Sequence, residues 1–283
     1  MSSRSLSRWR RRPFPVVCGI QVHCILLIAV TLPPGVAAAQ SVLRVCADPN
    51  NLPFSNQQQQ GFENKLAELA AAKLGMRLEY SWWAQRKSFI KNSLDQGVCD
   101  AVMGIPSSLP SVSATKPYYR STYVFVWRRD RNLELKSLDD ARLSGLRIGI
   151  HVVGDDYAPP AAALARSGIT SNIVGFSPFG EYGEKDPPRK IIDAVANGAI
   201  DVAIVWGPFA GYFAKQEDTA LEIAAVSPSS FLGIPFTYEI SVGVRKGNDA
   251  LRARLDEVLQ RECAAVQGIV SAYGVPQIHV GVQ

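Results

Sequence analysis

The sequence predicts an α/β fold of two lobes, each a mainly parallel sheet flanked by helices, joined by two hinge strands. The order strand, helix, strand, helix, strand occurs twice, within residues 43–105 and again within residues 146–206. This order is typical of parallel α/β units. Two long β-rich runs, residues 118–130 and 236–248, flank the second copy and are candidates for the connections between lobes.

The first copy is defined by alternating hydrophobic residues, helical spacing and glycine stops. Residues 43–47 form the first predicted strand, and residues 62–74 follow as a helix that a glycine ends. Residues 77–82 alternate as a strand, and a helix is expected over residues 89–97. Residues 99–105 are almost wholly apolar, as expected for a strand covered on both faces.

The second copy repeats this pattern with different residues. Strands are predicted at residues 146–152, 173–176 and 200–206. An alanine-rich helix is expected over residues 159–168, with prolines in its first turn, where they are tolerated. A second helix is expected over residues 189–197 before a glycine.

One continuous helix over residues 249–272 is predicted to return the chain to the first lobe. The expected organisation is a signal peptide at residues 1–39, lobe 1 at residues 40–124 and 233–283, and lobe 2 at residues 125–232. The length of 283 residues and the 47% hydrophobic content suit about two globular units.

Residues 1–39 predict a secretory signal peptide. They contain five arginines and no acidic residue, then an apolar run over residues 16–30, then Ala37-Ala38-Ala39 before a cleavage point near Gln40. The alternative is a membrane anchor, but the apolar run is shorter than the roughly 20 residues that span a bilayer. We expect export to the periplasm and no membrane span after cleavage.

Removal of these five arginines reduces 30 basic residues to 25, which equals the 25 acidic residues. A mature chain without net charge has no electrostatic footprint for nucleic acid. Three cysteines remain, and an oxidising compartment allows one disulfide. Cys46 and Cys99 lie at strand positions expected to be neighbours and are the first candidate pair, with Cys263 left free.

The loop at residues 48–54 follows the first predicted strand. Ligands of open parallel sheets bind beyond the carboxyl ends of the strands. Two such ends that face each other would form a cleft between the lobes, and hinge closure could enclose a ligand there. We therefore expect Asn50 to Phe54 to line this cleft.

Six segments, in this order along the chain, resemble landmarks of the periplasmic solute-binding proteins of family 3. They read LRVCADPNNLPFS, GFENKLAELAAAKLG, GVCDAVMG, TKPYYRSTYVFV, LRIGIHVVGDDY and NGAIDVAIVWGP. This resemblance implies the type II periplasmic binding fold. The segments LRVCADPNNLPFSN, GFENKLAE, CDAVMGIP and SATKPYYRSTYVFVWRRDR resemble more specifically the MxaJ/XoxJ-type proteins.

The MxaJ/XoxJ resemblance implies an association with periplasmic pyrroloquinoline-quinone (PQQ) alcohol dehydrogenases, above all methanol dehydrogenases. The expected function is that of a non-catalytic accessory or assembly factor. Its expected partners are the quinoprotein dehydrogenase and its cytochrome c. The alternative is a receptor that delivers a small solute to an ABC permease.

The chain departs from the three features with which family 3 proteins hold an amino acid. The family's arginine position falls where this chain reads Leu109-Pro110-Ser111-Val112. The helix start that should receive a carboxylate carries Asp155 and Asp156, and the strand that should end in an acid ends in Trp206. A buried charged group without a partner costs several kcal/mol, so an amino-acid ligand is not expected.

Aromatic residues take the place of these anchors and are candidates for contact with a partner or an apolar ligand. Trp206 and Tyr119 are expected to be the most exposed, whereas Tyr212 is a further aromatic near the cleft. The expected cleft residues are Asn51, Phe54, Trp83, Ser107, Tyr118, Tyr119, Arg120, Asp155, Asp156, Trp206 and Phe209.

No catalytic residue, cofactor or metal is predicted. Asp155 and Asp156 read as caps of the following helix, with a hard-cation site as the alternative. His151 with Asp155 is the one acid/base pair available for an enzyme such as a dehydratase. No nucleophile elbow, P-loop or dinucleotide-binding glycine motif accompanies it.

Overall fold

The computed structural model of this protein describes residues 40–153, 156–179 and 184–278. The predicted signal peptide at residues 1–39 lies outside them. One sheet path joins eight strands in the order β10-β8-β11-β7-β15-β5-β1-β4, and β12, β6 and β9 pair with members of this path. The pairs are parallel at both ends of the path and antiparallel in its middle.

The eight strands of the sheet path fall close to the eight predicted segments, whereas the other described strands were not predicted. Their bounds are β1 Val42–Ala47, β2 Asn50–Asn51, β3 Ser55–Asn56, β4 Arg77–Trp82, β5 Ala101–Pro106, β6 Ser113–Ala114, β7 Tyr119–Arg128, β8 Ile148–Val153, β9 Asp156–Tyr157, β10 Ile173–Phe176, β11 Val202–Trp206, β12 Leu221–Ala225, β13 Ser230–Phe231, β14 Ile234–Pro235 and β15 Thr237–Val244. The helices are α1 Phe62–Leu74, α2 Phe89–Asn92, α3 Pro159–Arg166, α4 Lys190–Ala196, α5 Gly207–Phe213, α6 Asp249–Arg261 and α7 Cys263–Ala272.

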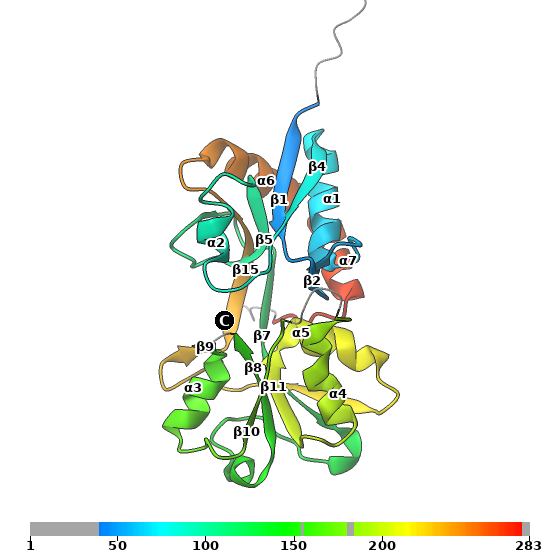
Figure 1. The fold of residues 1–283 in the computed structure, drawn as a ribbon, viewed down its shortest axis with the longest axis vertical. Helices are drawn as coiled ribbons and strands as arrows, with labels where there is room; N and C mark the ends of the chain where they lie inside the picture. Colours follow the sequence, from blue (N-terminus) through cyan, green and yellow to red (C-terminus); the bar gives the residue numbers. More distant parts are fainter. Residues whose placement is uncertain (1–39, 154–155, 180–183, 279–283) are drawn as a thin grey trace, which may run out of the picture. The chain divides into compact units, whose positions relative to one another are not determined.

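Strands β7 and β15 are the two long segments that connect the two parallel groups (Figure 1). Residues Tyr119 to Thr122 of β7 pair with β15, and from Tyr123 onward β7 pairs with β11. One parallel group is β5-β1-β4 and the other is β10-β8-β11, so the predicted two-lobe α/β class with two connecting strands is confirmed. The lobe boundaries at residues 124/125 and 232/233 stay a prediction.

Two predicted helices are wrong in extent. The helix expected over residues 249–272 is two helices, because the backbone leaves helical geometry at Glu262 (φ −95°, ψ 20°). There Glu262 forms an ion pair with Lys73 of α1 at 2.9 Å. The helix expected over residues 89–97 ends at Asn92, and Ser93 Oγ donates to the carbonyl of Phe89 at 2.5 Å, a local bond that competes with the helix.

The buried side chains form three clusters. The largest contains residues from both parallel groups, among them Phe62 and Leu66 of α1 and Ile191 and Phe213 from α4 and α5. A second packs around Phe125 and the strands β8 and β11. Continuity of the largest cluster means that the two lobes share part of one core.

The third cluster surrounds a disulfide between Cys46 of β1 and Cys99, which precedes β5. Their Cα atoms lie 5.5 Å apart, in the usual range for a disulfide. The bond forms there because β1 and β5 are neighbouring strands, with Cys46 opposite Val102. The predicted pair is thus confirmed, and Cys263 is free and exposed.

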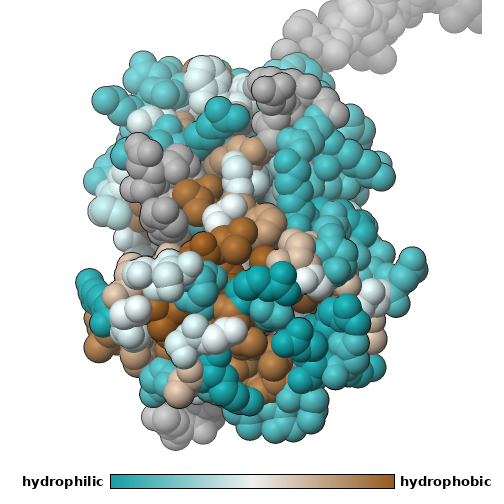
Figure 2. Space-filling model, turned by 60° about the horizontal axis from the view of Figure 1, so that its bottom comes forward, coloured by the Kyte–Doolittle hydropathy of each residue, from teal (hydrophilic) through white to brown (hydrophobic). Residues whose placement is uncertain are grey.

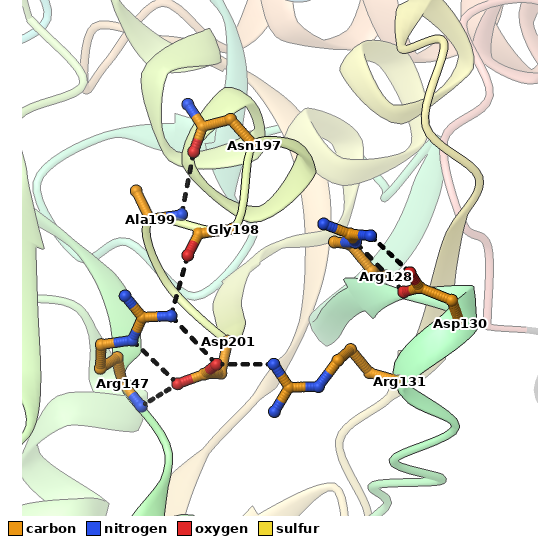
Figure 3. A network of polar contacts seen from close by, with 8 residues as sticks. All are labelled: Arg128, Asp130, Arg131, Arg147, Asn197, Gly198, Ala199 and Asp201. Atoms are coloured by element: carbon orange, nitrogen blue, oxygen red, sulfur yellow. Dashed lines mark hydrogen bonds and ion pairs between the residues drawn. The ribbon is translucent and has the colours of Figure 1, made fainter.

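An ion-pair network lies where strands β8 and β11 begin, at the amino ends of the parallel group β10-β8-β11 (Figure 3). Asp201, before β11, accepts hydrogen bonds from the Arg147 backbone N–H at 2.9 Å and from the Arg147 guanidinium, and Arg131 reaches its other side at 3.0 Å. These contacts, led by the hydrogen bond from Arg147, lower the pKa of Asp201 to about 2. The network joins the start of β11 to the start of β8, away from their carboxyl ends.

The surface carries some apolar side chains. Figure 2 shows hydrophobic residues gathered near the middle of one face, with hydrophilic residues around them. The exposed large hydrophobic residues in the described ranges are Trp83, Val98, Val174, Ile223, Leu232 and Ile278. Among the described residues, no helix has the length and apolar character needed to cross a bilayer.

Candidate functional site: an uncharged aromatic cavity

A cavity of about 460 Å³ lies where the loop after β1 meets strands β5, β7, β8, β11 and β15. Its lining residues are Asn51, Phe54, Gln85, Gly104, Pro106, Tyr123, His151, Ala158, Pro159, Pro178, Phe179, Trp206, Phe209, Tyr238 and Ile240. Sites for small molecules commonly measure about 300–1,000 Å³ and are mostly apolar. This cavity is therefore the candidate functional site.

The loop that follows β1 is held by the Asp48 side chain, which is buried. Its carboxylate accepts a hydrogen bond from the Asn50 backbone N–H at 2.8 Å and another from the Gln85 backbone N–H at 2.6 Å. The Ser55 hydroxyl donates to the Asp48 carbonyl at 2.8 Å. These bonds fix the short β2–β3 hairpin and so place Asn51 and Phe54 on the cavity.

Aromatic rings form two groups on the cavity wall. In the first, the Phe209 ring lies 5.0 Å from Phe54 and 5.0 Å from His151, edge-on to both. In the second, Trp206 lies 5.4 Å from Tyr123 and 5.8 Å from Tyr238. Tilted and edge-on pairs at such distances are favourable, so the wall is a packed aromatic surface.

His151 is at the carboxyl half of β8 and is only 7% exposed. Burial lowers its pKa to about 4, although the nearby backbone of Pro188 opposes that shift. The imidazole is therefore neutral at pH 7. Its Nε2 is buried and has no hydrogen-bond partner among the described residues.

The described residues that line the cavity include no aspartate, glutamate, lysine or arginine. Because His151 is neutral as well, this lining presents no formal charge at pH 7. A zwitterionic amino acid would find no counter-charge for either end on these residues, and each unpaired buried charge costs several kcal/mol. The lining fits an uncharged or apolar occupant.

A buried acid lies immediately behind this wall. Glu63, in the first turn of α1, is 8% exposed, and burial with help from the negative charge of Asp48 raises its pKa to about 8. Its Oε1 would lie 1.7 Å from a Cβ placed on Gly104, which lines the cavity. Glycine at this point thus makes room for the carboxyl group, which is protonated at pH 7.

Four of the predicted cleft residues meet at the cavity. Asn51 and Phe54 arrive from the loop after β1, Trp206 ends β11, and Phe209 lies in α5. Whether they bind a ligand or a partner stays a prediction.

The other predicted positions lie elsewhere. Tyr118 and Tyr119 are core residues, 6% and 4% exposed, so the exposure predicted for Tyr119 is wrong. Tyr119 packs edge-on against Phe62 at 5.9 Å, which covers it. Arg120 forms an ion pair with Glu239 across the β7–β15 pair, and Trp83 is 46% exposed outside the cavity lining.

The remaining predictions near this site are settled only in part. Ser107 is partly buried, and its backbone N–H donates to the Glu239 carbonyl at 2.8 Å. Tyr212 stacks on Tyr273 with ring centres 5.7 Å apart and does not line the cavity. Asp155 lies outside the described residues, and the side chain of Asp156 is not described. The part of the chain that the structure describes contains no group of three or more potential metal ligands.

Sequence reasoning missed several residues of this site. Glu63 reads as an ordinary acid of a helix's first turn, and nothing near it in sequence signals burial. Gln85, Tyr123 and Tyr238 were not expected at the cleft, although Tyr123 and Tyr238 lie in the two predicted connecting runs. His151 was expected to be an ordinary strand residue, and its place at the end of a predicted strand was the available signal.

The fold and a ligand-sized cavity beyond strand ends define a binding protein of two α/β lobes. The family model of bacterial extracellular solute-binding proteins, family 3, matches residues 43–265, and the chain belongs to this family. It is similar to the protein MoxJ of Methylorubrum extorquens, with 30% identity over 84% of this chain and 82% of that protein. It is also 27% identical to MoxJ of Paracoccus denitrificans over 93% of this chain and 97% of that protein.

Solved structures agree with this assignment. The periplasmic binding protein XoxJ from Methylobacterium extorquens AM1 is 34% identical, with a TM-score of 0.68 over 84% of this chain and all of that one. MxaJ from Methlophaga aminisulfidivorans MPT is 25% identical, with a TM-score of 0.73 over 83% of this chain and all of that one. The predicted type II binding fold and the resemblance to MxaJ/XoxJ-type proteins are confirmed.

Proposed function

We propose that this chain is a periplasmic, non-catalytic binding protein that serves a PQQ-dependent alcohol dehydrogenase system, above all methanol dehydrogenase, as an accessory or assembly factor. The similarity to MoxJ, MxaJ and XoxJ supports the assignment to this dehydrogenase system, because the resemblance to proteins of this type implies an association with such dehydrogenases. The uncharged aromatic lining is the observation that separates this function from amino-acid transport. Its partners are the quinoprotein dehydrogenase and its cytochrome c.

The test uses the chain from Gln40 onward, immobilised and exposed separately to purified apo and PQQ-loaded dehydrogenase from the same organism. We expect at least one form to be retained, and deletion of the gene to lower alcohol-dependent dye reduction in periplasmic extracts. Retention of neither form, together with unchanged dye reduction after deletion, would exclude the accessory function.

A transporter receptor for a small uncharged solute is the second candidate. The cavity volume of about 460 Å³ favours it, because this is the size of a small-molecule site. A solute that binds only the folded chain stabilises it by about 2.7 kcal/mol at 100 times its Kd. A thermal-shift screen of periplasmic solutes tests this candidate.

Matched variants sharpen the screen. Trp206→Ala should abolish the shift caused by a transported solute, since Trp206 lines the cavity. Trp83→Ala, which removes an exposed tryptophan outside the lining, should leave it unchanged. If both variants lose the shift equally, the solute does not bind in this cavity.

The non-catalytic assignment depends on His151. Among the described lining residues, His151 and two tyrosines are the titratable side chains. His151 is a neutral imidazole, and among the described residues no carboxylate pairs with it, as one does in orienting a general base. We expect the pure protein to be silent in dehydratase assays. Turnover that disappears in His151→Gln would contradict this assignment.

A further inference from the structure

A second pocket adjoins the aromatic cavity. It has a volume of about 380 Å³ and lies between the segment that follows β4 and the end of β5. Gln85, Gly104 and Pro106 line both the cavity and this pocket. Because the two spaces share these walls, one ligand can extend from the cavity into the pocket.

The second pocket differs from the cavity in charge. Its charged lining residues are Arg86, Lys91 and Asp95, and all three are exposed, so a ligand can reach them. The charge of Arg86 also acts on Asp48, but that carboxylate is buried and already accepts two backbone N–H bonds. Two cations and one acid on the lining leave an excess of one positive charge, which favours an anionic group in this pocket.

Arg86 lies at the border between the two spaces. Its Cζ is 5.7 Å from the centre of the Phe179 ring, which lines the aromatic cavity. The preceding residue, Gln85, is fixed by its backbone N–H, which donates to Asp48 at 2.6 Å, and by its Oε1, which accepts from Asn51 at 3.2 Å. Within the described part of the chain, Arg86 forms no ion pair, and neither does Lys91, so both cations can pair with a ligand.

The two spaces suit two parts of one molecule. The rings of Trp206 and Phe209 and their neighbours offer a packed aromatic surface to a flat apolar body. A guanidinium binds a carboxylate through two parallel N–H donors, and such charge-assisted hydrogen bonds are stronger than neutral ones. A ligand with both parts keeps its charge out of the uncharged cavity, where that charge would have no partner among the described lining residues.

We propose that the cavity and the second pocket together bind a flat, apolar or aromatic molecule that carries a carboxylate. The ring lies in the aromatic cavity, and the carboxylate pairs with Arg86 and Lys91. This inference rests on the proposal that the chain binds without catalysis, and it does not depend on the dehydrogenase partner. It makes Arg86 and Lys91 the residues that select an anion over a neutral molecule of the same shape.

The experiment compares three probes of nearly equal shape by isothermal titration calorimetry at neutral pH and low ionic strength. p-Toluate is an anion, p-toluamide is neutral and p-toluamidine is a cation. We expect p-toluate to bind at least about tenfold more tightly than p-toluamide, the order of one charge-assisted hydrogen bond. The cation should bind more weakly than p-toluate.

Variants assign each part of the ligand to its space. The double variant Arg86→Gln with Lys91→Gln should bind p-toluate and p-toluamide with equal affinity. Lys116→Gln, which removes an exposed lysine that lines neither space, should keep the wild-type preference. Trp206→Ala should weaken the binding of both probes by about the same factor, because the ring that they share lies against Trp206.

Added salt gives a readout that needs no substitution. It should weaken the binding of p-toluate and leave that of p-toluamide nearly unchanged, since salt screens pairs of exposed charges. Equal affinity of the two probes for the wild type, no binding of p-toluate, or a preference that survives the double variant would each overturn the inference. Retention of the dehydrogenase by the same preparation would then show that only the ligand class is wrong.

Discussion

Replacement of Glu63 by glutamine should remove a pH dependence of folding that the buried carboxyl group creates. The pKa of Glu63 is about 8 in the folded chain and 4.5 in the unfolded chain. Between these values the unfolded chain releases a proton that the folded chain keeps. Stability is therefore full below pH 4.5 and is lost as the pH rises toward 8.

The size of the effect follows from the two pKa values. Each pH unit between 4.5 and 8 costs about 1.36 kcal/mol, so the whole interval costs about 5 kcal/mol. Glutamine has nearly the shape of the protonated acid and does not titrate. Glu63→Gln should match the wild type at pH 4.5 and exceed it by about 5 kcal/mol at pH 8.5.

Urea unfolding of both proteins at five pH values from 4.5 to 8.5 measures this difference directly. Glu68→Gln is the control, because Glu68 is on the same helix but pairs with Lys65 at the surface, where such pairs contribute little, so its difference from the wild type should stay small. A difference for Glu63→Gln that does not change with pH, or that falls as the pH rises, would refute the reasoning. Either result would mean that the carboxyl group is ionised in the folded chain.

Three further predictions concern residues around the same site and the disulfide. Gly104→Ala should destabilise the fold more than Gly75→Ala in urea unfolding. Both glycines have φ near +70°, but a Cβ on Gly104 would meet the Glu63 side chain, whereas one on Gly75 would meet open space. Equal losses of stability in the two variants would contradict the steric argument. The double variant Cys46→Ala with Cys99→Ala should lose about 4 kcal/mol of stability, from a closed loop of 53 residues, and reductant should no longer affect its urea midpoint. Between pH 6.5 and 4 the wild type should lose about 3 kcal/mol of unfolding free energy, because the unfolded chain protonates His151 and the folded chain does not. His151→Gln should remove this loss. A parallel decline in both proteins would contradict the prediction.

The fold was predictable because its signals are local. Most of the parallel strands are short apolar runs, β4 alternates apolar and polar residues, and glycine follows several of the helices, as Gly75 does after α1. The break between α6 and α7 was not predictable, because no proline or glycine marks Glu262 and its ion pair with Lys73 joins segments far apart in sequence. The short α2 likewise depends on a side-chain bond from Ser93 that periodicity does not show.

The site was predictable where a residue follows a strand end, and unpredictable where burial depends on distant partners. Asn51, Phe54 and Trp206 belong to the first kind, since strand ends define one edge of a sheet. Glu63 belongs to the second, because the space for its carboxyl group comes from Gly104, 41 positions later. Tyr119 of strand β7 was misjudged for the same reason, since the Phe62 ring that covers it comes from helix α1.

The pKa values of the two buried groups explain together why an uncharged occupant suits this cavity. Above about pH 4 the imidazole of His151 is neutral, and below about pH 8 the carboxyl group of Glu63 is protonated. Between these limits neither the histidine on the wall nor the acid behind Gly104 carries a charge. Desolvation is the first cause of both shifts, so the same apolar packing that neutralises the groups would also penalise a charged ligand. Ionisation of Glu63 would favour a cation in this cavity, so the affinity of a cation should rise with pH toward 8, whereas the affinity of an uncharged ligand should stay constant over that interval.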